Sequence, residues 1–464
     1  MDCGLAIGHL SLDLLRRYNV PGPRYTSYPT APVWKEGVGA REYEALLLES
    51  AREDEPRPLS LYLHLPFCEK LCYFCGCTVV ITGSEHRLED PYLSTLEREI
   101  DWVASRAGHR RPVVQLHLGG GTPTYFAPDR LEALLARLRD RFVFSSDAEL
   151  GVEVDPRVTT PQHLAALARA GFNRLSMGVQ DFDPQVQAAI NRIQPYDDTR
   201  PLVEEAHRLG FPSVNMDLIY GLPYQTPVSF GATIDRVLEI APDRLAVYSY
   251  ANVPWMKKHQ RILEPHLPGE AEKFGIFQTA LERFQSAGFE YIGMDHFARP
   301  DDELARARRN RTLHRNFQGY TTKAGTDLIG LGMSAIGEVG DGYVQNARDL
   351  APYRAAVERE GAATFRGVRL TADDRLRKSV IQSLLCHGVI VKAEIERDHG
   401  IDFDETFADA LERLRPCAED GLVELLPAEI RATPVGRVFL RNLAMPFDAY
   451  LTAPTERPVF SRTL

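Results

Sequence analysis

The stretch Leu59-Ser-Leu-Tyr-Leu-His-Leu65 runs into Cys68-Glu-Lys-Leu-Cys72-Tyr-Phe-Cys75-Gly-Cys77, and these residues decide the fold. A short apolar run of this kind predicts a strand buried in a sheet. The first three cysteines have the spacing C-x3-C-x2-C. Three thiolates hold three irons of a [4Fe-4S] cluster and leave the fourth iron open, whereas most clusters are held by four cysteines. The loop therefore predicts a cluster on which chemistry takes place.

Zinc is the alternative metal for this loop. Structural zinc sites usually pair two C-x2-C units or add histidines at short spacing. The chain has no second unit of that kind, and His64 and His86 are poorly spaced for zinc. Cys77 would close the open iron if it were a fourth ligand, and it lies only two residues after Cys75. We therefore expect an iron–sulfur cluster with Cys77 beside it and not bound to it.

Outward from the loop, apolar runs alternate with helical patterns. The predicted strands are residues 59–65, 113–118, 148–154, 174–179, 213–219 and 244–250. Runs rich in Val, Ile and Leu that are spaced by helices are typical of a parallel sheet covered on both faces. Six such βα units predict an α/β fold with a partial (β/α)6 barrel. The active site of such a fold lies at the carboxyl ends of its strands.

Several polar or glycine-rich segments directly follow these predicted strands. Three glycines and a threonine, residues 119–122, come after the second strand and suit an anion site, since glycine lets backbone N–H groups approach a ligand. Glu153 and Gln180 end the next two strands, and Arg192 and Asp217 belong to the fourth and fifth units. Each residue alone is equally typical of a helix cap. Their shared position on one rim favours contacts with a ligand.

Outside the barrel the chain divides into three further segments. Residues 1–57 form an irregular arm that contains the Pro- and Tyr-rich stretch 21–29, and residues 58–300 form the barrel. Residues 291–298 read as one more strand. Residues 301–365 are a connecting segment, and residues 366–464 are a mostly helical module with a small β wing. The module's expected helices are 373–386, 392–398, 405–418 and 433–443.

Composition excludes several classes of protein. The 464 residues carry a net charge of −10, which disfavours nucleic-acid binding. No apolar run reaches the roughly 20 residues of a membrane span, and the N-terminus does not resemble a signal peptide. Cys3, Cys386 and Cys417 are scattered, so a disulfide framework is not expected. We expect a cytoplasmic protein whose thiols stay reduced.

The cysteine loop, with Phe74 directly before its third cysteine, resembles the radical S-adenosylmethionine (SAM) superfamily. Beyond it, the chain resembles the oxygen-independent coproporphyrinogen III oxidase family along nearly its whole length. The segments that carry this resemblance are residues 22–29, 72–77, 119–125, 172–181, 217–223, 293–300 and 314–322. The far C-terminus, Met445-Pro-Phe-Asp448, matches more loosely.

The resemblance implies specific roles for residues of this chain. Cys68, Cys72 and Cys75 would ligate the cluster, and SAM would take the open iron. Cys77 matches a family cysteine that is not a ligand, with a catalytic role. The positions that resemble SAM contacts of the family are Tyr62, Phe74, Gly120, Gly121, Thr122, Glu153, Gln180, Arg192, Asp217, Ala251 and Ile336. Tyr62, beside the loop, is also our candidate for steering intermediates.

The same resemblance implies the chemistry and the partners. The substrate would be coproporphyrinogen III, two of whose propionates become vinyl groups with loss of CO2, through 5′-deoxyadenosyl radicals from SAM. Two SAM molecules per chain, an electron donor such as flavodoxin or ferredoxin, and a monomeric state are implied as well. Such oxidation of an unactivated carbon needs a cofactor, because acid–base side chains cannot perform it.

A substrate with four carboxylates needs arginines, which grip carboxylates through two parallel hydrogen bonds. Arg24 and the neighbourhoods of Arg299 and Arg315 are the candidates, and the arm around Arg24 is a candidate lid.

Two other functions stay open. One is a haem-carrying chaperone of the related radical SAM group, whose members typically lack the arm and the Cys-Gly-Cys ending. The other is a radical SAM enzyme that acts on a different substrate.

Overall fold

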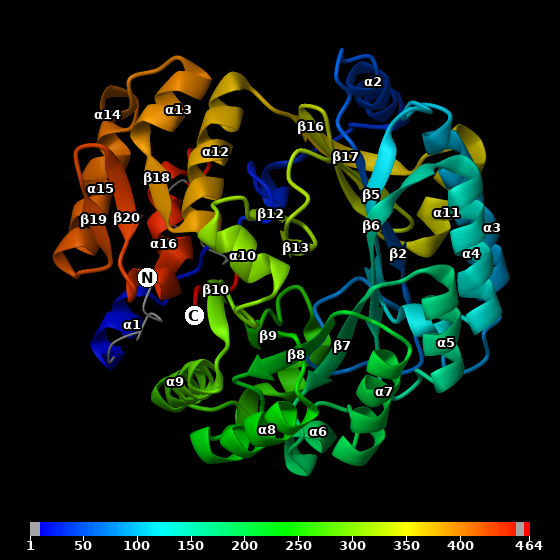
Figure 1. The fold of residues 1–464 in the computed structure, drawn as a ribbon, viewed down its shortest axis with the longest axis horizontal. Coiled ribbons are helices and arrows are strands. Elements are labelled where there is room, and N and C mark those ends of the chain that lie inside the picture. The colour runs from blue at the N-terminus through cyan, green and yellow to red at the C-terminus, as the bar shows by residue number, and fades with distance from the viewer. Residues whose placement is uncertain (1–9, 452–458) are drawn as a thin grey trace.

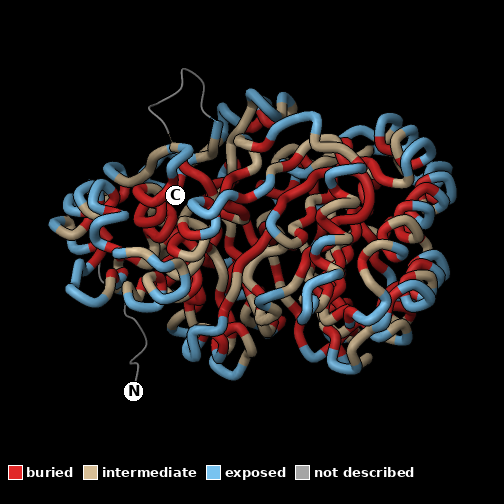
Figure 2. Tube along the Cα trace, turned by 90° about the horizontal axis from the view of Figure 1, so that it is seen from above, coloured by how far each residue is buried: buried red, intermediate tan, exposed pale blue. Residues whose placement is uncertain are grey.

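The computed structural model describes residues 10–451 and 459–464 (Figure 1). Within these residues, thirteen strands form one curved sheet in the order β1-β17-β16-β15-β14-β2-β5-β6-β7-β8-β9-β11-β10. The order has two ends, β1 (Lys35–Glu36) and β10 (Glu290–Gly293), so this sheet is an open, partial barrel. Figure 2 shows buried chain running through the centre of the molecule and exposed chain around its rim.

The six predicted strands are confirmed, and they lie side by side in parallel. They are β2 (Leu59–Leu65), β5 (Pro112–Gly120), β6 (Val143–Val154), β7 (Arg174–Gln180), β8 (Val214–Tyr220) and β9 (Arg244–Ser249). Burial is nearly complete along β2, where only Tyr62 is partly exposed, as expected for a strand covered on both faces.

Helices cover the outer face of these strands (Figure 1). They are α3 (Glu89–Ala104), α4 (Pro128–Arg141), α5 (Pro161–Ala170), α6 (Pro184–Ala189), α7 (Tyr196–Arg208), α8 (Pro227–Ile240) and α9 (Glu270–Ser286). Several of them begin with proline after a capping side chain; Thr160 and Thr226, for example, accept hydrogen bonds from the backbone N–H groups of the first turn. This arrangement leaves the loops at the carboxyl ends of the strands free to build a site. No described helix is long and apolar enough to cross a membrane.

The expected single strand at residues 291–298 is wrong. The segment forms a hairpin of β10 and β11 (His296–Ala298), because Met294 and Asp295 have φ values of +41° and +83°. A positive φ in two successive residues reverses the chain, which the apolar pattern alone does not reveal. The reversal places the Asp295 side chain near the N-terminal arm.

Residues 301–365 continue the main sheet. After α10 (Glu303–Arg309) and the small hairpin of β12 (His314–Asn316) and β13 (Gly319–Thr321), strand β14 (Asp327–Leu331) pairs in parallel with β2. The sheet continues antiparallel through β15 (Ile336–Val339), β16 (Gly342–Asn346) and β17 (Thr364–Arg369), with α11 (Leu350–Glu360) between the last two. The cysteine-loop strand therefore has a neighbour on each side.

The C-terminal region packs beside the barrel (Figure 1). Its elements are α12 (Ala372–His387), β18 (Val389–Val391), α13 (Lys392–His399), α14 (Phe403–Thr406), α15 (Ala408–Glu419), β19 (Val423–Leu425), β20 (Glu429–Ala432) and α16 (Leu440–Ala444). The expected helix 405–418 is two helices, and the expected helix 433–443 begins as a 3-10 turn at Gly436.

The N-terminal arm is tied to this C-terminal region. After α1 (Leu12–Tyr18), Tyr25 and Tyr28 are buried and bond to Asp448 Oδ2 (3.1 Å) and Ala449 N (3.0 Å). The chain then enters α2 (Ala40–Ala51) and the barrel. The arm is thus part of the core and holds Arg24 in a fixed place.

Candidate active site at the carboxyl ends of the strands

The cysteine loop, residues 68–77, lies between the end of β2 and a short parallel pair of strands, β3 (Phe67–Cys68) and β4 (Val80–Ile81). Two backbone hydrogen bonds hold the start of the loop, from Thr122 N to Phe67 O at 2.9 Å and from Thr82 N to Cys68 O at 3.1 Å. The cysteines are therefore presented by a loop that is anchored to strands β4 and β5.

A cavity of about 200 Å³ opens beside this loop. Twelve of the fifteen sequence-predicted site residues line it: Cys68, Phe74, Cys72, Cys75, Cys77, Gly120, Gly121, Thr122, Glu153, Gln180, Arg192 and Asp217. Strands β5, β6, β7 and β8 thus bring their ends to one place. Tyr62, Ala251 and Ile336 do not line this cavity.

Two arginines lie against the sulfur of Cys72. Arg157 Nη2 is 3.3 Å and Arg192 Nη1 is 3.5 Å from Cys72 Sγ. Both guanidinium groups also bond to the buried Asp155, at 2.7 Å and 2.9 Å. Burial alone would raise the pKa of Asp155, but the two arginines lower it to about 2. The group therefore places positive charge beside the sulfur of Cys72.

The other two predicted ligands have weaker polar partners. Cys68 Sγ lies 3.4 Å from Thr122 Oγ1, and burial raises the pKa of its thiol to about 11. The thiols of Cys75 and Cys77 share a hydrogen bond that lowers the pKa of Cys75 to about 6 and raises that of Cys77. Cys77 therefore interacts with a predicted ligand through its sulfur. These donors fit a cluster bound through three thiolates.

The glycines bring the ends of β5 and β2 together. Gly121 N donates to Leu65 O at 2.9 Å, and Gly120 has a φ of +108°, which only glycine adopts readily. A Cβ at Gly119 would lie 2.7 Å from Glu153 Oε1, and one at Gly120 would collide with the ring of His64. The groups that lie close to these glycines are therefore groups of the protein itself, namely Glu153, His64 and Leu65.

Glu153 is the carboxylate of the cavity wall. It accepts hydrogen bonds from His117 Nε2 at 3.2 Å and Gly120 N at 3.3 Å. Burial raises its pKa, but the hydrogen bonds from His117 and Gly120 and the nearby charges of His117 and His64 together outweigh burial, so the pKa of Glu153 is lowered. Asp217 behaves in the opposite way, because burial and the nearby charge of Glu153 raise its pKa to about 6. An ionised Glu153 suits a cationic or hydroxyl group of a ligand.

Tyr62 and Ile336 lie in one row across the sheet. Tyr62 on β2 is paired with Gly330 on β14, whose opposite neighbour on β15 is Ile336. Because His64 Nε2 donates to Thr78 O, His64 Nδ1 accepts the hydrogen bond from the Tyr62 hydroxyl at 3.1 Å. The ring of Tyr62 stacks on His117. Ala251 connects to the loop differently, because Gln260 Nε2 bonds to both Ala251 O and Phe74 O.

A second polar region lies farther along β8 and β9. We call it the arginine side, and it consists of Arg24, Tyr248, Asp295, His296, Arg315 and Tyr320. Arg24 pairs with Asp295 at 2.9 Å. A series of ring contacts runs from Arg24 to Arg315 through Tyr248, His296 and Tyr320. Burial and the charge of Asp217 both raise the pKa of Tyr248, so the arginine side is electrostatically coupled to the cluster-side cavity.

Arg315 on the arginine side forms no ion pair with any described residue. Its side chain is buried, and Nε and Nη1 have no hydrogen-bond partner among the described residues. A buried guanidinium without a partner is costly, which indicates a site for an anion. Arg299, the third candidate, is not part of this group. Its Nε donates to Pro242 O, and it stacks on Phe289.

Sequence analysis missed Arg157, His259 and Lys257. His259 and Lys257 donate to carbonyl oxygens of the cysteine loop from about 180 residues away, so no local pattern signals them. Arg157 lies two residues after Asp155, a strand-end carboxylate. The position of Arg157, two residues after this strand-end carboxylate, was the signal in the sequence that could have indicated it.

Two family models match the chain. The model of the radical SAM superfamily matches residues 62–237, and the HemN C-terminal domain matches residues 370–439. The fold and the three-cysteine cavity therefore define a radical SAM protein, a class that uses a [4Fe-4S] cluster and SAM. Curated relatives specify it further. The chain is 48% identical to the oxygen-independent coproporphyrinogen III oxidase of Salmonella typhimurium, over 98% of both chains.

Similar relatives occur in other bacteria. The enzyme of that name from Pseudomonas aeruginosa is 45% identical, over 97% of this chain and 98% of the relative. The solved structure of coproporphyrinogen III oxidase (HemN) from Escherichia coli, described as a radical SAM enzyme, has a TM-score of 0.90 and 46% identity. That comparison covers 96% of this chain and 99% of that one. The chain belongs to the oxygen-independent coproporphyrinogen III oxidase family.

Proposed function

We propose that this protein is an oxidoreductase that converts two propionates of coproporphyrinogen III to vinyl groups without oxygen, giving protoporphyrinogen IX. The proposal rests on the three-cysteine cavity. The chain that forms it is 48% identical, over 98% of its length, to a protein named oxygen-independent coproporphyrinogen III oxidase. When bound, the cluster and SAM supply the one-electron chemistry that oxidises an unactivated carbon. The protein's own residues hold, orient and enclose the reactants.

Cys68, Cys72 and Cys75 would hold the cluster. The guanidinium groups of Arg157 and Arg192 support this role, because they compensate the charge of the Cys72 thiolate. Asp155 in turn holds both arginines in place. Cys77 stays off the iron and interacts with Cys75. A thiol in this position is suited to handing a proton to a reactant, which is the catalytic role we assign to it.

SAM would lie against the glycines and the strand ends that line the cavity. The ionised Glu153, held by His117, suits a polar group of SAM. The remaining contacts that we propose are Phe74, Gly120, Gly121, Thr122, Gln180, Arg192, Asp217 and Ala251.

A second SAM molecule would bind near Tyr62 and Ile336. Both residues lie in one row of the sheet, with Gly330 between them, where the backbone of Ile336 lies so close that a Cβ would not fit. Tyr62 stacks on His117, the partner of Glu153, so this position adjoins the first SAM site.

The porphyrinogen would lie between the cavity and the arginine side. Arg315 supports this position, because its unpartnered, buried Nε and Nη1 suit a carboxylate. Arg24 is a second carboxylate ligand, whose pairing with Asp295 keeps it oriented in the free enzyme. The arm that carries Arg24 would act as a lid over this end of the barrel.

We also propose the setting of the reaction. The division into an arm (1–57), a barrel (58–300), a connecting segment (301–365) and a C-terminal module (366–464) follows from the sequence pattern. The enzyme acts as a cytoplasmic monomer and receives electrons from a flavodoxin or a ferredoxin. A reduced intracellular compartment suits six described cysteines that are all free thiols.

Anaerobic assay of the iron-reconstituted protein tests the function. Incubation with coproporphyrinogen III, SAM and dithionite should release CO2 and form vinyl products, methionine and 5′-deoxyadenosine. If the protein instead binds haem and forms none of these products, it is a haem chaperone and the proposal is wrong. Formation of 5′-deoxyadenosine without CO2, together with turnover of another substrate, would identify a different radical SAM enzyme.

A further inference from the structure

The segment that follows β9, residues 252–262, packs on the cysteine loop from outside the barrel. Three of its side chains donate to backbone carbonyl oxygens of the loop: Lys257 Nζ to Cys77 O at 2.6 Å, His259 Nε2 to Cys75 O at 3.0 Å, and Gln260 Nε2 to Phe74 O at 2.9 Å. We call residues 252–262 the basic segment. It is joined by single hydrogen bonds to Cys75, a predicted cluster ligand, and to the neighbouring residues Phe74 and Cys77.

The outer surface of the basic segment is apolar at three positions. Trp255, Met256 and Ile262 are 43%, 62% and 59% exposed. Ile262 also lines a surface hollow of about 380 Å³ together with Tyr224, which is itself 40% exposed. Large apolar side chains gathered on one part of a surface mark an interaction site more often than single ones do.

The charge of this segment is opposite to that of the whole protein. Lys257, Lys258 and Arg261 lie within five residues, and Glu264 is the nearest acidic residue along the chain. The chain as a whole has a net charge of −10. Lys258 and Arg261 are exposed, and their side chains form no hydrogen bond or ion pair among the described residues. They are therefore free to attract an acidic partner.

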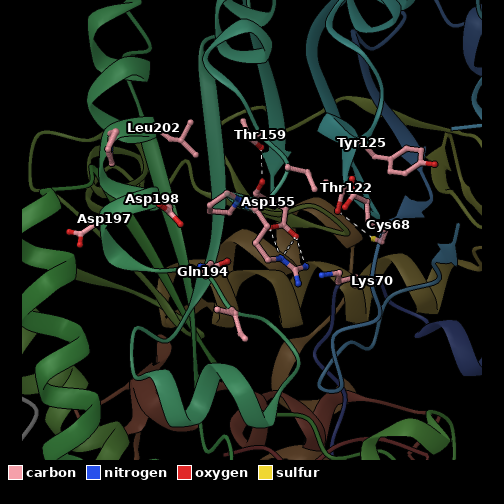
Figure 3. A pocket seen from close by; sticks show the side chains of 16 residues that line it. Cys68, Lys70, Thr122, Tyr125, Asp155, Thr159, Gln194, Asp197, Asp198 and Leu202 are labelled. Carbon is pink, nitrogen blue, oxygen red and sulfur yellow. Dashed lines mark hydrogen bonds and ion pairs between the residues drawn. The ribbon is translucent and has the colours of Figure 1, made fainter. Parts of the chain in front are cut away.

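The other approach to the cysteine loop has the opposite charge. A cavity of about 600 Å³ reaches Cys68 from the side of α7. Figure 3 shows Asp197 and Asp198 on one side of it and Cys68 and Lys70 on the other. Among its charged lining residues, acidic side chains outnumber basic ones: Glu69, Asp155, Asp197 and Asp198 against Lys70 and Arg157. An acidic protein would be repelled there and attracted to the basic segment.

We propose that the basic segment is the docking surface for an acidic one-electron carrier protein that reduces the cluster. This inference rests on the proposed function, since it assumes a cluster at the cysteine loop. The carrier's anionic flavin hydroquinone would give up one electron and become the neutral semiquinone without losing a proton, and the cluster held by Cys68, Cys72 and Cys75 would take up that electron. Lys258 and Arg261 steer the approach, and Trp255 provides the aromatic anchor typical of protein interfaces.

A charge-reversal pair tests the docking surface. The variant Lys258→Glu/Arg261→Glu is compared with Arg52→Glu/Arg110→Glu, which makes the same change in net charge with two exposed arginines near the amino ends of the strands. The probe is an acidic flavodoxin. Its affinity is measured by calorimetry, and the rate at which its hydroquinone reduces the cluster is measured by stopped-flow at low ionic strength. We expect a rate about ten-fold lower or more in the first variant only.

Dithionite separates docking from the chemistry. With this small reductant, the Lys258→Glu/Arg261→Glu variant should form 5′-deoxyadenosine and CO2 at the parent rate, and Trp255→Ser should behave in the same way while binding flavodoxin several-fold more weakly. Equal flavodoxin affinities and rates in the two charge-reversal variants would overturn the inference. So would loss of the dithionite-driven reaction in the first variant alone, because the segment would then support the cluster and not the carrier. Failure of the parent protein with dithionite would overturn the proposed function instead.

Discussion

Buried charges are paired differently in two parts of this barrel. One part is the cysteine loop with Asp155, Arg157 and Arg192, which we call the cysteine side; the other is the arginine side. On the cysteine side, Asp155 pairs with both Arg157 and Arg192, and these arginines point at Cys72 Sγ. On the arginine side, Asp295 pairs with Arg24 at 2.9 Å, and Arg315 forms no ion pair among the described residues.

The difference shows which part of the site is complete without a ligand. The cysteine side has its countercharge built into the chain, so its geometry is fixed before the cluster is bound. On the arginine side Arg315 keeps two buried nitrogen atoms unpartnered among the described residues. Because a buried charge without a partner is unfavourable, an incoming carboxylate gains a strong, well-aligned interaction there. The arginine side should therefore decide which substrate reacts, and the cysteine side whether any reaction occurs.

The largest effect is expected on the cysteine side. Cys72→Ser should abolish turnover, because it removes the thiolate that both arginines support. Iron content and the absorbance of the reconstituted protein should fall with it. The control is Cys417→Ala, a buried cysteine of α15 outside the site. Full iron content and activity in Cys72→Ser would exclude the proposed ligand set.

Arg315→Gln should break the arginine side while leaving the cysteine side intact. Loss of a buried carboxylate partner should lower kcat/KM for coproporphyrinogen III by about 100-fold. The absorbance of the cluster should not change. Arg299→Gln is the matched control, since Arg299 also lies in a segment that carries the family resemblance but contacts Pro242 and Phe289. Equal kinetics in the two variants would remove Arg315 from the site.

Arg24→Gln should have a smaller effect of the same kind. Arg24 already has a partner in Asp295, so a substrate carboxylate must share it, and we expect kcat/KM to fall about 10-fold. Steady-state assays at several substrate concentrations would show the loss mainly in KM. A fall in kcat alone, with KM unchanged, would indicate that Arg24 acts on a later step.

The smallest expected effect concerns stability at low pH. Burial, and then the charge of Arg315, lower the pKa of His296 to about 4. Because the unfolded chain binds this proton near pH 6.5, the stabilisation is present above pH 6.5 and is lost as the pH falls toward 4. Between pH 7.5 and 5.0 the parent protein should therefore lose on the order of 2 kcal/mol more stability than His296→Gln, as measured by urea unfolding. An equal loss of stability in His296→Gln and in the parent protein would contradict this expectation.

Most of the cysteine side was predictable from sequence, and little of the arginine side was. The strands follow from apolar runs, and the rim residues follow from their positions at strand ends, because parallel strands bring those ends together. The hairpin at Met294 and Asp295 depends on positive φ values that the apolar run hides. Long-range contacts had no local signal either. Arg315 and Arg299 are equivalent in the sequence, and only the fold separates them.

The ratio of CO2 to 5′-deoxyadenosine tests the division between the two sides most directly. It is measured anaerobically, with dithionite, SAM and coproporphyrinogen III, for the parent protein, Arg315→Gln and Cys72→Ser. We predict that Arg315→Gln still forms 5′-deoxyadenosine but releases much less CO2 for each molecule formed, whereas Cys72→Ser forms neither product. An unchanged ratio in Arg315→Gln would contradict the assignment of the arginine side to the substrate.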